Sequence, residues 1–145
     1  MLENMNTLEL IPSKKYLIRL HKGEEILESL KSFCKENNIE SGFAMMIGAI
    51  SSVNLALYEL NKKEYFRKSF DGAFEIASMS GNITKMNGEL ITHIHGIYSD
   101  KNFETIAGHV DRAVVSATCE ILLTTFENKI SRQKSEEIGL NLLDL

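Results

Sequence analysis

Residues 92–110, THIHGIYSDKNFETIAGHV, contain three of the four histidines of the chain: His93, His95 and His109. Two stretches rich in β-branched and aromatic residues flank the polar turn formers SDKN, which predicts two strands joined by a turn. Residues two apart in a strand point to the same face of a sheet, so His93 and His95 are expected to be neighbours. The segment therefore predicts a β-hairpin that presents imidazole groups on one face.

The place of His109 depends on the pairing register of this hairpin. If His93 pairs with His109, as a connection with an odd residue count allows, all three rings share a face. An even count turns His109 to the opposite face, and both registers are compatible with the sequence. Three imidazoles are the ligand set of open metal sites, and they suit zinc, nickel, copper or iron. The alternative is that the rings hydrogen-bond to the backbone or to each other at a buried interface.

Strand-like texture continues over most of the chain outside this hairpin. Short stretches rich in β-branched and aromatic residues alternate with turn formers, beginning with a strand expected over Tyr16–Leu20. The turn formers are LNKKE, FDG, KMNGE and SDKN, and Gly81 is expected to bend the strand that contains Glu75. Asn87-Gly88 favours a tight hairpin, because both residues adopt positive φ at low cost. These features predict a largely antiparallel sheet.

One helix is expected after the first strand, opening at HKGEE and stopping at ENN. Glu24 and Glu25 are expected in its first turn, where the helix dipole favours negative charge. Its apolar residues repeat at helical spacing and form one stripe. They are Ile26, Leu27, Leu30, Phe33 and Cys34. With 145 residues, the chain is expected to form a single α+β domain over residues 1–145, with this helix packed on the sheet.

The amino-acid composition makes some classes of binding partner less favourable than others. The formal net charge of -4 disfavours binding to bare DNA phosphates, although it leaves room for a local basic patch. Cys34 and Cys119 form no C-x-x-C motif and are expected to be buried thiols in a reducing compartment. The N-terminus shows no signal-peptide pattern and no apolar stretch approaches the length of a membrane span. The sequence therefore predicts a cytoplasmic protein with no membrane partner.

Some of the expected strands are apolar on both faces, among them FAMMIGAI and VVSATCEILL. One face would pack on the helix, and the other also needs cover. An oligomer interface is the favoured cover, and the alternative is the C-terminal segment IGLNLLDL.

Two glutamates lie inside apolar strands, and each needs a partner or a shifted pKa there. Glu75 is a candidate general acid or base, or a group that orients a ligating histidine, with an ion pair to an arginine as the alternative. For Glu120 the ion pair is favoured. A fourth protein ligand to a metal would have to come from Asp111, Asp100 or Glu75. The sequence carries no phosphate-binding loop, catalytic serine triad or dinucleotide fingerprint.

The order of several blocks resembles the plant and prokaryote conserved (PPC) domain, which follows the AT-hooks in plant AT-hook nuclear-localised proteins and also occurs alone in prokaryotes. The blocks are RLHKGEEILESL, GAISSVNLALYE, GAFEIASMSGNI, HIHG, AGHV and CEILL. The resemblance covers a core of about residues 16–126, followed by a C-terminal extension over 127–145.

This resemblance implies an antiparallel sheet of about seven strands with flanking helices, assembled as a homotrimer. It also implies that His93, His95 and His109 hold a divalent metal ion near a subunit boundary, with zinc expected. Family members often carry a double glycine before the third histidine, whereas this chain has Ala107-Gly108. The AT-hook that gives the family its name for DNA binding is not in this sequence, and the resemblance names no reaction.

Two functions follow as hypotheses. The first is a metal-dependent homotrimer with a small-molecule ligand or a hydrolytic role, in which Glu75 is a candidate acid or base. The second is a DNA-binding or DNA-associated regulatory protein, or a protein-interaction module, without catalysis. The missing AT-hook and the acidic charge favour the first.

Overall fold

Seven strands and one helix are formed by residues 5–145, which are the residues that the computed structural model describes. The first four residues of the domain expected over 1–145 lie outside this range. The elements are β1 (Pro12–His21), α1 (Ile26–Glu36), β2 (Gly42–Glu59), β3 (Glu64–Met86), β4 (Glu89–Ser99), β5 (Thr105–Phe126), β6 (Ser131–Lys134) and β7 (Asn141–Asp144).

All seven strands join one sheet, in the order β1-β5-β2-β3-β6-β7, with β4 paired to β3 and β5. The pairings β2–β3, β3–β4, β4–β5 and β5–β2 close on themselves, because β5 pairs with both β2 and β4. The pairings are antiparallel except for one parallel contact, Lys85 with Ser131, between β3 and β6. The sheet is therefore mixed but mainly antiparallel, close to the expectation.

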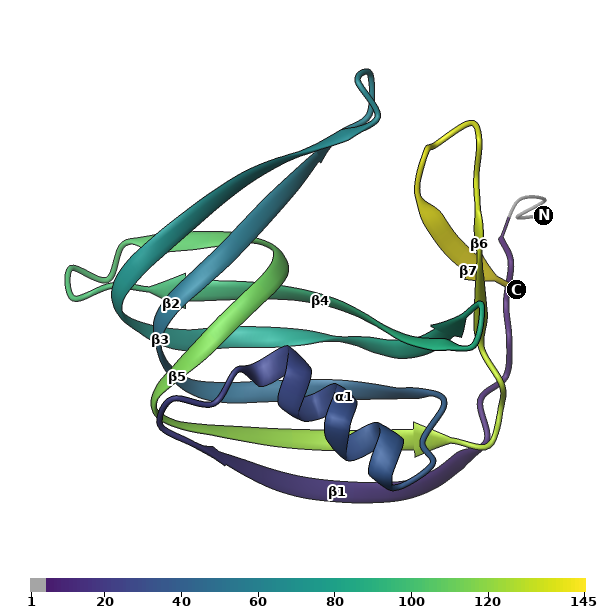
Figure 1. Cartoon of the computed structure of the whole chain (residues 1–145), viewed down its shortest axis with the longest axis horizontal. Coiled ribbons are helices and arrows are strands. Elements are labelled where there is room, and N and C mark those ends of the chain that lie inside the picture. The colour runs from purple at the N-terminus through teal and green to yellow at the C-terminus, as the bar shows by residue number, and fades with distance from the viewer. Residues whose placement is uncertain (1–4) are drawn as a thin grey trace.

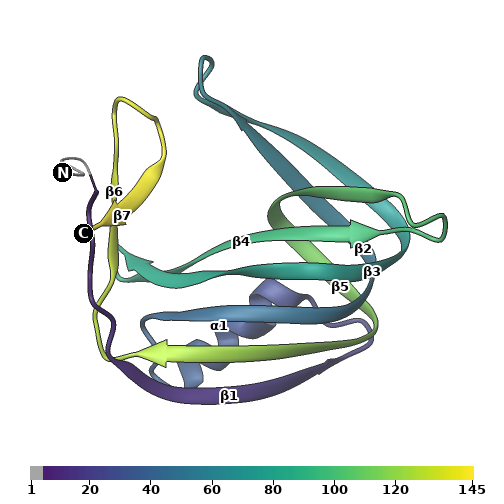
Figure 2. The same cartoon turned by 180° about the vertical axis from the view of Figure 1, so that it is seen from behind.

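The helix covers one face of the sheet: it lies in front of the sheet in Figure 1 and behind it in Figure 2. Its apolar stripe is buried: Ile26, Leu27, Leu30 and Cys34 pack into the core with sheet residues such as Ile121 and Leu123. The stripe drives packing because removing apolar surface from water is favourable. Glu25 is the N-cap rather than a first-turn residue, since its carboxylate accepts a hydrogen bond from Glu28 N at 2.7 Å.

Two features of the expected fold are wrong. The described residues contain a single helix, α1, where flanking helices were expected. The strands are also longer than the turn formers indicated. FDG forms a β-bulge inside β3, where Ile50 pairs with Phe74 but Ser52 pairs with Asp71.

Gly81 does not bend β3, which runs on to Met86. A Cβ on Gly81 would lie 1.9 Å from His93 O, so glycine is needed there for close approach to β4. By contrast, Asn87 and Gly88 form the expected hairpin turn, with φ of 51° and 83°. The turn formers at residues 60–63 and 100–104 also separate strands as expected.

The sheet face opposite α1 carries an exposed apolar strip, defined here as Leu17 of β1, Leu122 of β5, and Phe43, Met45 and Ile47 of β2. Leu122 pairs with both Leu17 and Met45, so the strip crosses three strands. Within the chain the C-terminal segment leaves most of it uncovered: Leu143 and Leu145 line a cavity with Phe43, but Leu17 is 81% and Met45 58% exposed. The cover favoured from the sequence, another subunit, remains a proposal.

Two hairpins rise from the sheet: a long one formed by β2 and β3, and a short one formed by β6 and β7 near the two termini (Figure 1). They meet through two hydrogen bonds to backbone carbonyls. Tyr58 Oη donates to Ile138 O at 2.6 Å, and Lys63 Nζ donates to Glu136 O at 2.6 Å. Within residues 5–145, no helix is both long and apolar enough to cross a membrane.

Candidate metal centre

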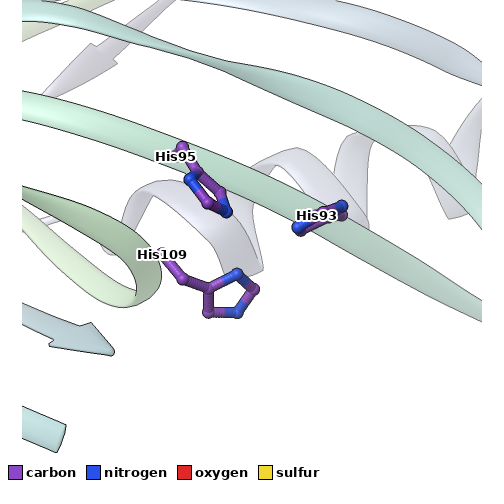
Figure 3. Close-up of side chains that lie close together, drawn as sticks. All are labelled: His93, His95 and His109. Carbon is purple, nitrogen blue, oxygen red and sulfur yellow. The ribbon is translucent and has the colours of Figure 1, made fainter. Parts of the chain in front are cut away.

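The three histidines converge. His95 of β4 pairs with His109 of β5, whereas the sequence-based alternative had paired His93 with His109. Because His93 and His95 are two residues apart and point to the same side of the strand, all three rings still lie on one face of the sheet. Ring centroids are 5.1 to 5.4 Å apart, and one ring nitrogen from each residue lies within 4.8 Å of the others. Figure 3 shows the side chains pointing toward one another from the two strands.

The turn between β4 and β5 sets this register. Asp100 Oδ1 accepts hydrogen bonds from Asn102 N at 2.8 Å and Glu104 N at 3.0 Å, which fixes the connection. Ser99 then pairs with Thr105, and His95 with His109 follows along the ladder. At His109 β5 also pairs with Ala56 of β2, so two neighbouring strands hold the backbone of this histidine.

His109 has an orphaned atom. Its Nδ1 is buried without a hydrogen-bond partner, whereas Asp111 Oδ1 lies 3.6 Å from its Nε2. The carboxylate favours a proton on Nε2, which leaves the Nδ1 lone pair free. Buried polar atoms are nearly always satisfied, so this nitrogen fits a metal ligand. Arg67 Nε donates to the other Asp111 oxygen at 2.9 Å and holds the carboxylate in place.

Burial keeps two of the rings neutral. It lowers the pKa of His93 to about 4, and nearby Arg132 and the other two histidines add to the effect. Burial also lowers the pKa of His109, although Asp111 opposes the shift. Neutral imidazole is the form that binds a metal.

The spacing fits a small cation after modest closure. Ligands at about 2.0–2.1 Å in tetrahedral geometry place their nitrogens roughly 3.4 Å apart. The described nitrogens lie within 4.8 Å of one another, so closing onto an ion requires each ring to move by about an ångström. Three nitrogen donors and no thiolate form an open site that suits zinc and similar ions.

Other residues singled out in the sequence lie outside this cluster. Glu75 is exposed, and in the ladder it lies beside Ala49 and Ser99. Its role as an acid or base stays a prediction. Glu120 lies opposite Arg19 in the β1–β5 ladder, next to the apolar strip, but within residues 5–145 it forms no ion pair, so the ion pair expected from the sequence is not seen. Cys34 and Cys119 are buried, as expected, and burial raises their pKa values to about 11 and about 12.

A cavity of about 660 Å³ adjoins the cluster. His93, His109 and Tyr65 form part of its wall, and the β6–β7 hairpin supplies Arg132 and the leucines at residues 140, 142 and 143. Sequence reasoning missed Arg132 and Tyr65, because neither belongs to a motif. The apolar run GLNLL at residues 139–143 was visible in the sequence, but nothing local connected it with the histidine hairpin at 92–110.

A mainly antiparallel sheet with one helix and an open three-histidine cluster defines the class of this protein. The chain belongs to the Plants and Prokaryotes Conserved (PCC) domain family, whose model matches residues 10–127. This confirms the resemblance seen in the sequence.

Solved structures of similar chains agree with the fold. A plant- and prokaryote-conserved protein from Pyrococcus horikoshii has a TM-score of 0.90 and 30% identity, covering 97% of this chain and 98% of its own. A metal-containing protein from Archaeoglobus fulgidus has a TM-score of 0.89 and 29% identity, covering 95% and 98%. A candidate DNA-binding protein from Bacteroides thetaiotaomicron has a TM-score of 0.87 and 31% identity, covering 93% and 96%.

Among curated proteins, the chain is 25% identical over 127 residues to the bifunctional protein GlmU of Synechococcus sp. (strain JA-3-3Ab). The match covers 86% of this chain but only 19% of that protein. The chain thus spans about a fifth of the length of this relative.

Proposed function

We propose that the protein is a homotrimer that binds a divalent metal ion, expected to be zinc, through His93, His95 and His109. The observation that carries the proposal is the buried, unpartnered Nδ1 of His109 beside two further imidazoles. The similar protein from Archaeoglobus fulgidus is described as metal-containing, which supports it.

The chemistry follows from an open site. A zinc ion held by the three histidines would supply a Lewis acid and would lower the pKa of a coordinated water toward ~7. The protein contributes the three imidazoles, Asp111 to orient His109, and the adjoining cavity for a small molecule. This arrangement suits a small-molecule ligand or a hydrolytic role. Glu75 stays the candidate acid or base from the sequence, although it lies outside the histidine cluster and the cavity lining.

The trimer is supported by the apolar strip. Met45 and His95 both pair with Ser80 of β3, and Phe43 and His93 both pair with Asn82. The strip and the histidines therefore share one face of the sheet. A neighbouring subunit seated on the strip would lie close to the metal site.

The first test is elemental analysis of protein purified without a histidine tag. We expect close to one zinc per chain in the wild-type protein and almost none in the His93→Ala, His95→Ala double variant. The matched control is His21→Ala, because His21 is exposed at the end of β1 and is the one histidine outside the cluster. Equal metal in the double variant and the control would disprove the proposal.

A second candidate function is DNA binding, because the similar protein from Bacteroides thetaiotaomicron is described as a candidate DNA-binding protein. Phosphate contacts make such binding strongly dependent on salt. The test is fluorescence anisotropy with a 30-base-pair duplex at about 50 and about 200 mM salt. With a net charge of -4 we expect no binding at either concentration, and salt-sensitive binding would favour the second candidate.

A further inference from the structure

Arg132 is a partly buried cation without an acidic partner. Its Nε donates to Thr84 Oγ1 at 2.9 Å, Nη1 to Asn141 O at 2.7 Å and Nη2 to Asn82 Oδ1 at 2.8 Å. All three acceptors are neutral. In residues 5–145 no carboxylate forms an ion pair with this guanidinium. Charged side chains withdrawn from water are usually paired, so the structure holds a positive charge ready for an anion.

The cavity around Arg132 is acid-free although the protein as a whole is acidic. Its ionisable lining groups are Arg132, His93, His109 and Tyr65, and none of the described lining residues is Asp or Glu. His93 lies beside the guanidinium, with Arg132 Nη2 at 3.5 Å from its Nδ1. The lining carries no carboxylate, and Asp111, which lies behind His109, is paired with Arg67, so an anion entering the cavity gains the unpaired positive charge of Arg132.

The remaining donor capacity limits which anion fits. A guanidinium has five N–H groups, of which three are bound to oxygens and a fourth faces His93 Nδ1. One N–H on Nη1 is left. A carboxylate needs few donors, whereas a phosphate spreads its charge over more oxygens than this site can satisfy.

The rest of the cavity is apolar. Leu140, Leu142 and Leu143 line one side and Ile91 extends the apolar surface. Leu142 and Leu143 are 40% and 38% exposed, so apolar area is available to a ligand. Burying the methylene groups of a ligand against these side chains would strengthen its binding, because apolar surface is removed from water.

We propose that this cavity binds a small carboxylate with a short apolar body, its carboxylate against Arg132 and its body against the leucines. The inference rests on the proposed function in that it names the ligand class of the same site. Arg132 and the leucines nevertheless act without a metal, so ligand binding can be measured separately from metal binding.

The test is isothermal titration calorimetry on the full chain, both zinc-loaded and treated with EDTA, with zinc content measured in each sample. The probes are hexanoate, the uncharged hexanamide, acetate, which lacks the apolar body, and inorganic phosphate. We expect hexanoate to bind at least tenfold more tightly than each of the other three. The inference would be overturned if hexanoate does not bind, if hexanamide binds as tightly as hexanoate, or if phosphate binds more tightly than hexanoate.

Two variants assign the binding to this cavity. Both variants remove apolar surface at Leu142, but only Leu142→Glu adds a negative charge to the wall, so we expect it to weaken hexanoate binding at least tenfold more than Leu142→Gln, which is of similar size, does. Arg132→Gln is expected to abolish binding while circular dichroism shows an intact sheet. If Arg132→Gln does not fold, the Leu142 pair decides the matter. Equal affinity in that pair would overturn the inference.

The metal measurements separate this inference from the proposed function. If the zinc-loaded protein does not bind hexanoate, the inference is overturned and the metal proposal is unaffected. Protein that binds no zinc but binds hexanoate through Arg132 would support the inference and disprove the metal proposal.

Discussion

At the scale of single residues, Asp111 connects a histidine to the rest of the fold. Its two carboxylate oxygens face His109 Nε2 at 3.6 Å and Arg67 Nε at 2.9 Å. Arg67 in turn lies over the ring of Tyr65, 5.0 Å from its centroid. The imidazole of His109 is thus oriented by a chain of side chains from β3 and β5.

We expect Asp111→Asn to lower zinc affinity by about 10–100-fold, because a ligating imidazole loses the carboxylate that orients it and raises its basicity. The measurement is a zinc titration against a competing chromophoric chelator. Asp71→Asn is the matched control, since Asp71 is exposed on β3 and lies in the FDG bulge. An unchanged zinc affinity in Asp111→Asn would show that Asp111 does not support the site.

At this scale the sequence predicted part of the site. H-x-H spacing placed His93 and His95 on one face, because the side-chain period of a strand is fixed. The position of His109 depended on how the turn at Asp100 closes, and several closures were compatible with the sequence. Arg132 lies far along the chain and reaches the site only because β6 pairs with β3, so no local pattern indicated it.

At the scale of elements, Glu25 joins the helix to the sheet. One carboxylate oxygen caps α1 at Glu28 N, and the other accepts a hydrogen bond from Ala113 N of β5 at 2.8 Å. Ala113 is fully buried, so its N–H has no access to water. A single side chain therefore sets where the helix begins and how it docks.

We expect Glu25→Ala to lower the free energy of unfolding by roughly 2 kcal/mol, about 1 from the lost cap and about 1 from the unsatisfied N–H. Urea denaturation followed by circular dichroism measures the change. Glu36→Ala, at the exposed end of the same helix, serves as the control and should change stability by less than about 0.5 kcal/mol. Equal effects of the two substitutions would contradict the double role of Glu25.

The sequence predicted the presence and type of the helix and strands more accurately than it predicted their ends. The helical stripe from Ile26 to Cys34 was correct because its period matches a surface helix. The strands were divided at FDG and Gly81, where turn-forming residues serve a bulge and a close strand contact instead. Local propensity does not distinguish a glycine that bends a strand from one that admits a neighbouring backbone.

At the scale of the whole molecule, the apolar strip is the feature that the isolated chain leaves uncovered. Ile47, Met45 and Phe43 are 58%, 58% and 42% exposed on the central strand β2. Contiguous exposed apolar surface on a sheet usually marks an interface. The sequence indicated this surface through strands that are apolar on both faces, but the number of subunits is not encoded in such a pattern.

We expect Met45→Asp to convert the proposed trimer into monomers, because it places a charge in the middle of the strip. Light scattering coupled to size-exclusion chromatography gives the mass directly. Phe103→Asp is the control: Phe103 is 86% exposed in the loop between β4 and β5, away from the strip. A trimer that survives Met45→Asp would place the interface elsewhere.

The most direct measurement of the central claim is X-ray absorption at the zinc edge of the zinc-loaded protein. A zinc site formed by the three histidines predicts imidazole scattering from three nitrogen ligands at about 2.0–2.1 Å, completed by one oxygen. A spectrum with sulfur ligands, or one without imidazole scattering, would contradict a site built from His93, His95 and His109.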